Sequence, residues 1–202
     1  TEFTLAQSRP RIIKQPADTI VCEMSYAQFT IFATSTRTLT FTWYKEPGIK
    51  LTGVRYHIAS DGTLTIISTV LADEGDYYCI VSDDYGNSTR SSSAHLGVNK
   101  RPIATATPSA QDHTCSNVAF TDIVLGETHG VPGTTYLWTR TQPAGITTMM
   151  PESGTVLNIG DFLAGTFINE TDAPITVTFT IIPVGPSPTY CTGETIYATV
   201  TV

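Results

Sequence analysis

Histidine and cysteine are the residue types in this chain that could hold a metal or act as nucleophiles. The four histidines, at positions 57, 95, 113 and 129, are scattered, and only His113 lies close to a cysteine, Cys115. A zinc site needs about four clustered Cys or His ligands, and the chain contains no CxxC pair. We therefore expect no metal ligands and no cofactor.

Motifs of known catalytic sites are also missing from the sequence. Neither GxSxG nor HExxH occurs, and no Gly-rich turn between a strand and a helix could cradle a phosphate group. Asp83 and Asp84 are adjacent, as a cation site would need, but neighbouring carboxylates in a turn between strands are more often a solvated hairpin tip. The sequence therefore predicts a protein that is not an enzyme.

The composition predicts that strands and the turns between them carry the histidines, cysteines and aspartates named above. Thr, Ser, Val and Ile are abundant, while 12 prolines and 15 glycines interrupt the chain at short intervals. The net charge of −7 argues against binding to nucleic acid or to an anionic membrane surface. No stretch approaches the roughly 20 apolar residues of a spanning helix, and TEFTLAQSRP at the start lacks the apolar core of a signal peptide. We expect the chain to be an excerpt from a longer protein.

Apolar and polar residues alternate along the first half with a period of two, which predicts half-buried strands. The clearest runs are QFTIFA (28–33), LTFTWYK (39–45) and GTLTIISTV (62–70). A tight hairpin, DDYGNS (83–88), then separates the strand that carries Cys79 from the next strand, SSSAHLGV (91–98). Such short strands at regular intervals are typical of a sandwich of two sheets.

Several single residues resemble the marks of an I-set immunoglobulin domain over residues 10–98. Trp43 stands where that fold has its core tryptophan, and Tyr77 stands two residues before Cys79, as in a tyrosine corner. In similar domains an arginine in the place of Arg55 pairs with the corner aspartate, which here is Asp73. The resemblance therefore implies an Arg55–Asp73 ion pair.

The strand-B cysteine that would normally bridge to Cys79 is missing, because Ala33 stands in its place. Cys22 is the only other cysteine in this half. If residues 13–22 form an edge strand, that strand ends at the end of the sandwich where the strand of Cys79 begins, so Cys22 could reach Cys79. The alternative is two unpaired, buried thiols.

The second half repeats the first in outline, which predicts two tandem domains. Cys115 precedes an apolar run and lies 23 residues before Trp138, compared with 21 residues between Cys22 and Trp43. Cys191 comes late, as Cys79 does in the first half. We expect a lead-in at 1–9, an immunoglobulin-like domain at 10–99 and a second sandwich at 100–202. Pro102 should restrict hinge motion at the junction.

The two halves also resemble repeats of very large surface proteins of Bacteroidota. QPADTIVCE and DYYCIVS are similar to immunoglobulin-like repeats in which a cysteine before strand B takes over the bridge to strand F; Met24 stands where those repeats carry glycine. ATATPSAQDHTCS and TYCTGE are similar to PKD-like repeats. The resemblance implies a fold of two Greek-key β-sandwiches. We expect one bridge in each, Cys22–Cys79 and Cys115–Cys191.

Such proteins are exported by type IX secretion and serve as adhesins, including gliding-motility adhesins. The resemblance implies a non-catalytic rod or spacer outside the cell, in contact with neighbouring repeats and with a surface polysaccharide or another surface protein. It implies no contact with nucleic acid and no direct membrane insertion. The alternative is an accessory spacer or carbohydrate-binding module of a secreted hydrolase. A carbohydrate-binding module needs a row of exposed aromatic residues, for which the candidates are Tyr44, Tyr56, Tyr78 and Tyr85.

Overall fold

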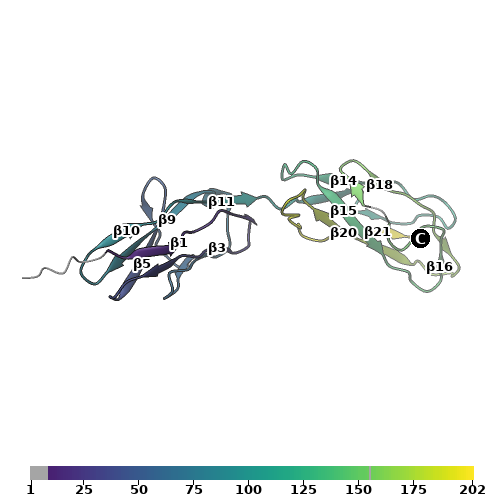
Figure 1. Cartoon of the computed structure of the whole chain (residues 1–202). Helices are drawn as coiled ribbons and strands as arrows, with labels where there is room; N and C mark the ends of the chain where they lie inside the picture. Colours follow the sequence, from purple (N-terminus) through teal and green to yellow (C-terminus); the bar gives the residue numbers. More distant parts are fainter. Residues whose placement is uncertain (1–8, 155) are drawn as a thin grey trace, which may run out of the picture. The chain divides into compact units, whose positions relative to one another are not determined.

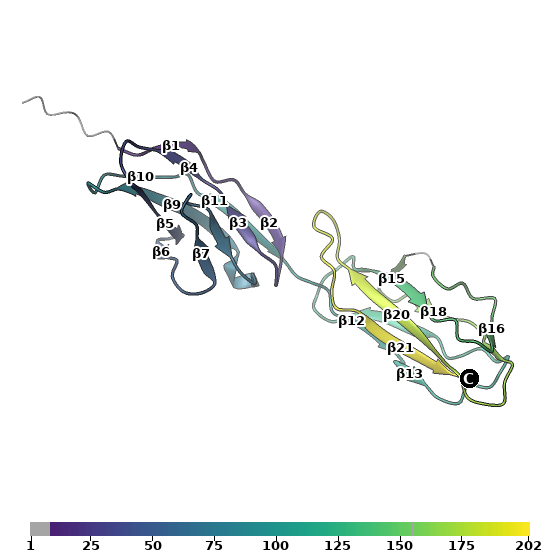
Figure 2. The same ribbon diagram turned by 90° about the horizontal axis from the view of Figure 1, so that it is seen from below.

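The computed structural model describes residues 9–154 and 156–202. The chain divides into two compact units that meet between Asn99 and Lys100, which is where the sequence places the domain boundary. Residues 1–8 of the expected lead-in lie outside the described residues. Both units are built from strands (Figures 1 and 2), and the helical content described is a single 3₁₀ turn, η1 (Leu71–Asp73).

Unit 1 is a sandwich whose larger sheet has the strand order β2-β11-β9-β5-β6, with β10 also paired to β9. The opposite layer contains β3-β8-β7 and the pair β1–β4. The strands are β1 (Arg11–Lys14), β2 (Thr19–Cys22), β3 (Ala27–Phe29), β4 (Phe32–Thr34), β5 (Leu39–Lys45), β6 (Ile49–Lys50), β7 (Tyr56–Ile58), β8 (Leu64–Ile66), β9 (Gly75–Asp83), β10 (Ser88–Arg90) and β11 (Ala94–Asn99).

Alternating apolar residues from both layers fill the core of unit 1, as the period of two predicts. Phe29 packs between Trp43 and Tyr77, with ring centroids 5.8 and 5.3 Å away. The Trp43 indole donates a hydrogen bond from Nε1 to the carbonyl of Gly62 at 2.8 Å. This tryptophan is therefore both buried and fully satisfied.

Unit 2 has the same plan, with a main sheet in the order β13-β21-β20-β15-β17. The second layer is β12-β14-β18, and β16 and β19 form a separate pair. The strands are β12 (Ala104–Thr107), β13 (Ala110–Gln111), β14 (Ile123–Glu127), β15 (Thr135–Arg140), β16 (Ile146–Thr147), β17 (Leu157–Asn158), β18 (Phe162–Leu163), β19 (Ile168–Asn169), β20 (Thr176–Val184) and β21 (Ile196–Thr201).

The register of the main sheets shows how closely the two units correspond. A short early strand runs parallel to the last strand in each unit, β2 along β11 and β13 along β21. Trp43 lies opposite Cys79, and Trp138 lies opposite Ile181. The position of Cys79 in unit 1 is therefore taken by an isoleucine in unit 2, not by Cys191.

The predicted Cys22–Cys79 bridge is wrong, because Cys79 is a free, buried thiol. Cys22 pairs with Asn99 on β11, three residues beyond Leu96, and Leu96 lies opposite Gly75 at the start of β9. Cys79 is four residues further along β9. At about 3.3 Å per residue the two cysteines are roughly 20 Å apart along the sheet, whereas a disulfide needs Cα atoms within about 7 Å.

The predicted Cys115–Cys191 bridge is also wrong, since Cys115 is a free, exposed thiol. Thr114, next to Cys115, donates its N–H to the Thr201 carbonyl. Thr201 pairs with Thr176, the first residue of β20, so Cys115 lies near that end of the main sheet. Cys191 lies next to Thr192, which bridges Val184 at the opposite end of β20. The cysteines that are disulfide-bonded are Cys22 and Cys191.

Candidate functional site

The corner that leads into β9 contains the predicted ion pair. The Nη2 of Arg55 donates to Asp73 Oδ2 at 2.5 Å and to the carbonyl of Ser68 at 3.0 Å. Asp73 also accepts the Val70 N–H at 2.8 Å, and the Tyr77 hydroxyl donates to the Asp73 carbonyl at 2.5 Å. The hydrogen bond that Arg55 donates to Asp73 raises the pKa of Arg55, and burial raises the pKa of Tyr77. All of these groups are occupied with one another, so the corner is structural.

Cys79 is a buried cysteine that forms no disulfide, and its thiol has little reactivity. Its main chain is tied to Ser91, which accepts the Cys79 N–H through Oγ at 2.9 Å and donates its own N–H to the Cys79 carbonyl at 2.8 Å. Burial raises the pKa of the Cys79 thiol to about 12. The thiolate is the nucleophilic form of cysteine, so this residue is inert in the folded protein.

The four tyrosines suggested as a carbohydrate platform do not form one. Tyr44 stacks on Tyr78 at 5.2 Å, but Tyr78 is buried because the Arg90 guanidinium lies 3.8 Å from its ring centre. Tyr56 packs against the core, and Tyr85 is 55% exposed, with the Arg37 guanidinium 3.9 Å from its ring centre. These four rings therefore offer no continuous open surface on which a sugar could stack.

Asp83 belongs to a hairpin tip. Its carboxylate accepts hydrogen bonds from the Tyr85 N–H, the Asn87 N–H and the Asn87 side-chain amide at 2.9–3.1 Å. These contacts favour the hairpin over a cation site. Among the described residues, no group of three or more His, Cys, Asp or Glu is placed to hold a metal ion.

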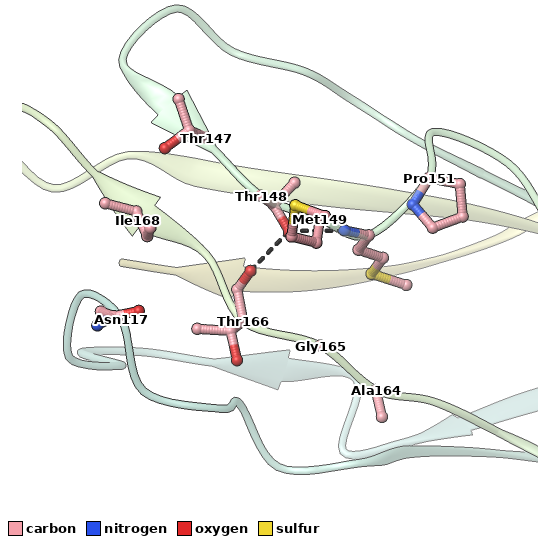
Figure 3. A pocket seen from close by; sticks show the side chains of 10 residues that line it. Asn117, Thr147, Thr148, Met149, Pro151, Ala164, Gly165, Thr166 and Ile168 are labelled. Carbon is pink, nitrogen blue, oxygen red and sulfur yellow. Dashed lines mark hydrogen bonds between the residues drawn. The ribbon is translucent and has the colours of Figure 1, made fainter.

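Unit 2 contains the strongest candidate site, a surface groove between two chain segments that we call the Met150 groove (Figure 3). One part has a volume of about 590 Å³ and is lined by Asn117, Thr147, Thr148, Met149, Met150, Pro151, Ala164, Gly165, Thr166 and Ile168. An adjoining part of about 410 Å³ is lined by Trp138, Met150, Pro151, Gly154, Leu157, Phe162, Leu163 and Ala164. Most of the lining is apolar.

Arg140 holds one wall of the groove in place. This buried side chain donates from Nε to the Pro151 carbonyl at 2.9 Å and from Nη2 to the Met150 carbonyl at 2.5 Å. Burial lowers the pKa of Arg140, while Glu152 opposes that effect. Thr148 ties this wall to the other, because its hydroxyl donates to the Thr166 carbonyl at 2.6 Å (Figure 3). The groove is therefore a fixed feature of the fold.

Trp138 lies on the floor of the groove with an unused hydrogen-bond donor. Its side chain is 8% exposed, and its Nε1 has no partner among the described residues, in contrast to Trp43. Gly154 lies over the ring so closely that a Cβ there would come within 2.3 Å of it. The two adjacent methionines differ, because Met149 is fully exposed and Met150 packs against the core.

The main sequence signals of structure are in place, but the groove was missed. Trp43, Tyr77, Arg55, Asp73 and Trp138 all occupy core or corner positions. The groove depends on where the chain leaves a sheet edge, and no residue pattern in MMPES (149–153) indicates that departure. The doubled methionine was the one available signal.

Comparison with known protein families supports two different domains in tandem. Residues 9–83 match the family model of the immunoglobulin domain, and residues 112–202 match that of the PKD-like domain. Among the described residues, none forms a helix of the length and apolar character needed to cross a membrane.

Relatives among characterised proteins are similar over part of the chain. Human leucine-rich repeat-containing protein 4C is 34% identical over 103 residues, which is 49% of this chain and 15% of that protein. Human neogenin is 30% identical over 81 residues, 40% of this chain and 6% of that protein. The chain thus spans a small fraction of the length of these relatives.

Solved structures that resemble the chain include segments of titin. The I-band fragment I67–I69 covers 97% of this chain and is covered over 65% of its own length, with a TM-score of 0.48 and 17% identity. Titin domain M7 aligns over 46% of this chain and 95% of its own length, with a TM-score of 0.42 and 32% identity.

Proposed function

We propose that the chain is a non-catalytic structural and adhesive segment of a larger extracellular protein. The observation that carries the proposal is the tandem arrangement of two complete sandwiches, each with a core of its own. The corner pair Arg55–Asp73 and the Asp83 carboxylate form hydrogen bonds within the fold, and the Cys79 thiol packs in its core. The matches of the two units to the immunoglobulin and PKD-like family models support a tandem of repeat domains.

The proposal places the protein outside the cell. The disulfide-bonded state of Cys22 and Cys191 supports this, because disulfides persist in oxidising compartments and are rare in the cytosol. Its partners would be neighbouring repeats of the same polypeptide and a polysaccharide or protein of the cell surface. In its finer form, the proposal is a surface adhesin of Bacteroidota, exported by type IX secretion and serving adhesion or gliding motility. That form is supported by the resemblance of QPADTIVCE, DYYCIVS, ATATPSAQDHTCS and TYCTGE to repeats of such proteins.

Small-angle X-ray scattering tests the spacer role. We expect an elongated particle with little contact between the units beyond the junction, because Pro102 and a short linker limit how they can fold together. A compact pair that buries well over about 1,000 Å² between the units would contradict the spacer role. Labelling of intact cells with an antibody to the chain tests the surface location, and labelling only after lysis would contradict it.

A further inference from the structure

The outer face of the main sheet, the face turned away from the core, differs between the two units. In unit 1 the Nδ1 of His95 lies 2.8 Å from Oδ1 of Asp76 on this face. The Arg90 guanidinium covers the Tyr78 ring and binds Glu46. Charged side chains therefore occupy this face of unit 1 and pair with one another.

The same face of unit 2 carries no charged side chain on its three long strands, β15, β20 and β21, all of whose residues are described. Register and alternation turn every second residue of these strands outward, opposite to the residues that fill the core. The outward residues are seven threonines, Leu137, Ile182, Val184 and Tyr197. Leu137 is 48% exposed and Tyr197 is 61% exposed. This part of the surface is therefore neutral and open to solvent.

Repulsion between acidic surfaces favours this face as the place where two copies meet. Residues 100–202 contain eight Asp or Glu and three Lys or Arg, so most contacts between two copies of unit 2 would bring like charges together. The neutral face avoids that cost. It also offers a cationic partner no charge to bind, since such a partner would prefer the acidic remainder of the surface.

The strand order makes the face complementary to itself under a two-fold axis. β20 is the middle strand of the order β13-β21-β20-β15-β17 (Figure 2), so an axis along β20 exchanges β21 with β15. Thr180 lies opposite Thr139 on one side and opposite Tyr197 on the other. The axis therefore places Tyr197 of one copy against Thr139 of the other, so that the largest side chain of the face meets a small one. Both side chains carry a hydroxyl that donates and accepts hydrogen bonds.

We propose that two copies of this chain associate through the outer faces of their unit 2 main sheets, about a two-fold axis along β20. Sheets stacked in this way lie about 10 Å apart, with their strands within about 30° of one another. Five strands about 4.8 Å apart and a middle strand of nine residues give at most roughly 700 Å² per copy, compared with about 800 Å² in a standard interface. Because β13 and β17 are short, the contact is smaller than this limit and belongs to the weak, reversible class. The inference goes beyond the proposed function, since a spacer needs no contact between copies, and its failure leaves that function standing.

Sedimentation of the full chain at increasing concentration tests the proposal. We expect reversible association from one chain toward two at concentrations up to millimolar. Added salt should strengthen it, because salt screens the repulsion between the acidic remainders of the two copies. A chain that stays monomeric at millimolar concentration would overturn the proposal. So would association that weakens with salt, since that dependence belongs to a contact between opposite charges.

A charge swap at Thr180 tests the position of the axis, which places Thr180 of one copy against Thr180 of the other. We expect Thr180→Lys and Thr180→Glu each to weaken self-association about tenfold or more. An equimolar mixture of the two variants should associate at least as tightly as the parent chain, a recovery that a misfolded variant cannot give. The matched control is Thr40→Lys, at an exposed threonine within β5 on the main sheet of unit 1, which should associate like the parent chain.

A second mixture tests the match across the axis. Tyr197→Asp should weaken self-association, and addition of a Thr139→Lys chain should recover it, because the new carboxylate of one copy then meets the new amine of the other. Undiminished association in the Thr180 variants would overturn the proposal. A loss that neither mixture recovers, in variants that keep the thermal unfolding midpoint of the parent chain, would contradict the two-fold axis along β20 and overturn it as well.

Discussion

Trp43 on β5 lies directly opposite Cys79 on β9, and no bridge connects that cysteine to the rest of the core. In unit 2 the same place opposite the tryptophan is filled by Ile181. In the core of each unit a tryptophan therefore lies beside a side chain that forms no disulfide, Cys79 in unit 1 and Ile181 in unit 2. A free cysteine behaves there as a small hydrophobic residue.

The state of the cysteines can be measured with a thiol reagent. We expect the native protein to react quickly at one thiol, Cys115, because it is exposed. Cys79 should react only after unfolding, since burial raises its pKa to about 12. Two thiols per chain should appear in denaturant without reductant. A count of zero would contradict the structure; Cys115→Ser and Cys79→Ala assign each thiol.

The corner ion pair should contribute modestly to stability. Arg55→Ala removes the partner of Asp73, whose side chain is nearly buried, and we expect a loss of about 1 kcal/mol in the free energy of unfolding. The matched control is Glu46→Gln, which removes the charge of the more exposed pair with Arg90, leaves the Arg90 guanidinium over Tyr78 and should cost less. A double-mutant cycle with Asp73→Ala isolates the coupling, and a coupling of zero would mean that Arg55 does not stabilise the corner through this contact.

Met24 should be replaceable by glycine with a gain in stability. Its φ is 60°, a left-handed conformation that costs a non-glycine residue about 1–2 kcal/mol, and its side chain is 69% exposed. Glycine adds unfolded-state entropy, so we expect a net gain of about 0.5–1 kcal/mol from Met24→Gly. The midpoint temperature of thermal unfolding should rise by a few degrees. Met149→Gly, at an exposed methionine without positive φ, should not be stabilising; equal effects at both sites would refute the backbone explanation.

The sequence predicted what depends on local pattern. The period of two identified the inward faces of the strands, and the spacing of Tyr77, Cys79 and Trp43 identified the corner and the core of unit 1. Arg55 and Asp73 could be paired because both flank the same corner. Each of these inferences depends on the alternation of neighbouring residues or on a short distance along the chain.

The remaining features depend on register between distant strands. Whether Cys22 can reach Cys79 is decided by how far β2 slides along β11, and nothing in the composition of either strand reports that offset. The groove beside Ala164 arises because the chain that follows β16, the partner of β19, turns away at Met149 and does not continue alongside β18. The missing partner of Trp138 is invisible in the sequence, since Trp43 in the same strand position has one.

Acid should destabilise unit 2 through Glu127. Burial raises the pKa of this carboxyl group, but hydrogen bonds from the N–H groups of Val131, Ile103 and His129 outweigh burial and lower the pKa overall. Because the pKa is lower in the folded protein than in the unfolded chain, Glu127 stabilises the fold above the ordinary value of 4.5, and this stabilisation is lost as the pH falls from there through the folded pKa.

Replacement of Glu127 with glutamine measures that contribution. We expect Glu127→Gln to lower the stability of unit 2 by about 1 kcal/mol at pH 7, since an amide oxygen accepts these hydrogen bonds more weakly than a carboxylate does. The difference from the parent protein should shrink at pH 3, where the carboxyl group gains a proton. Hydrogen exchange of β14 and β20 amides follows unit 2 alone. Glu194→Gln, at an exposed side chain, is the control, and a deficit in Glu127→Gln that is independent of pH would show that charge at this position does not matter.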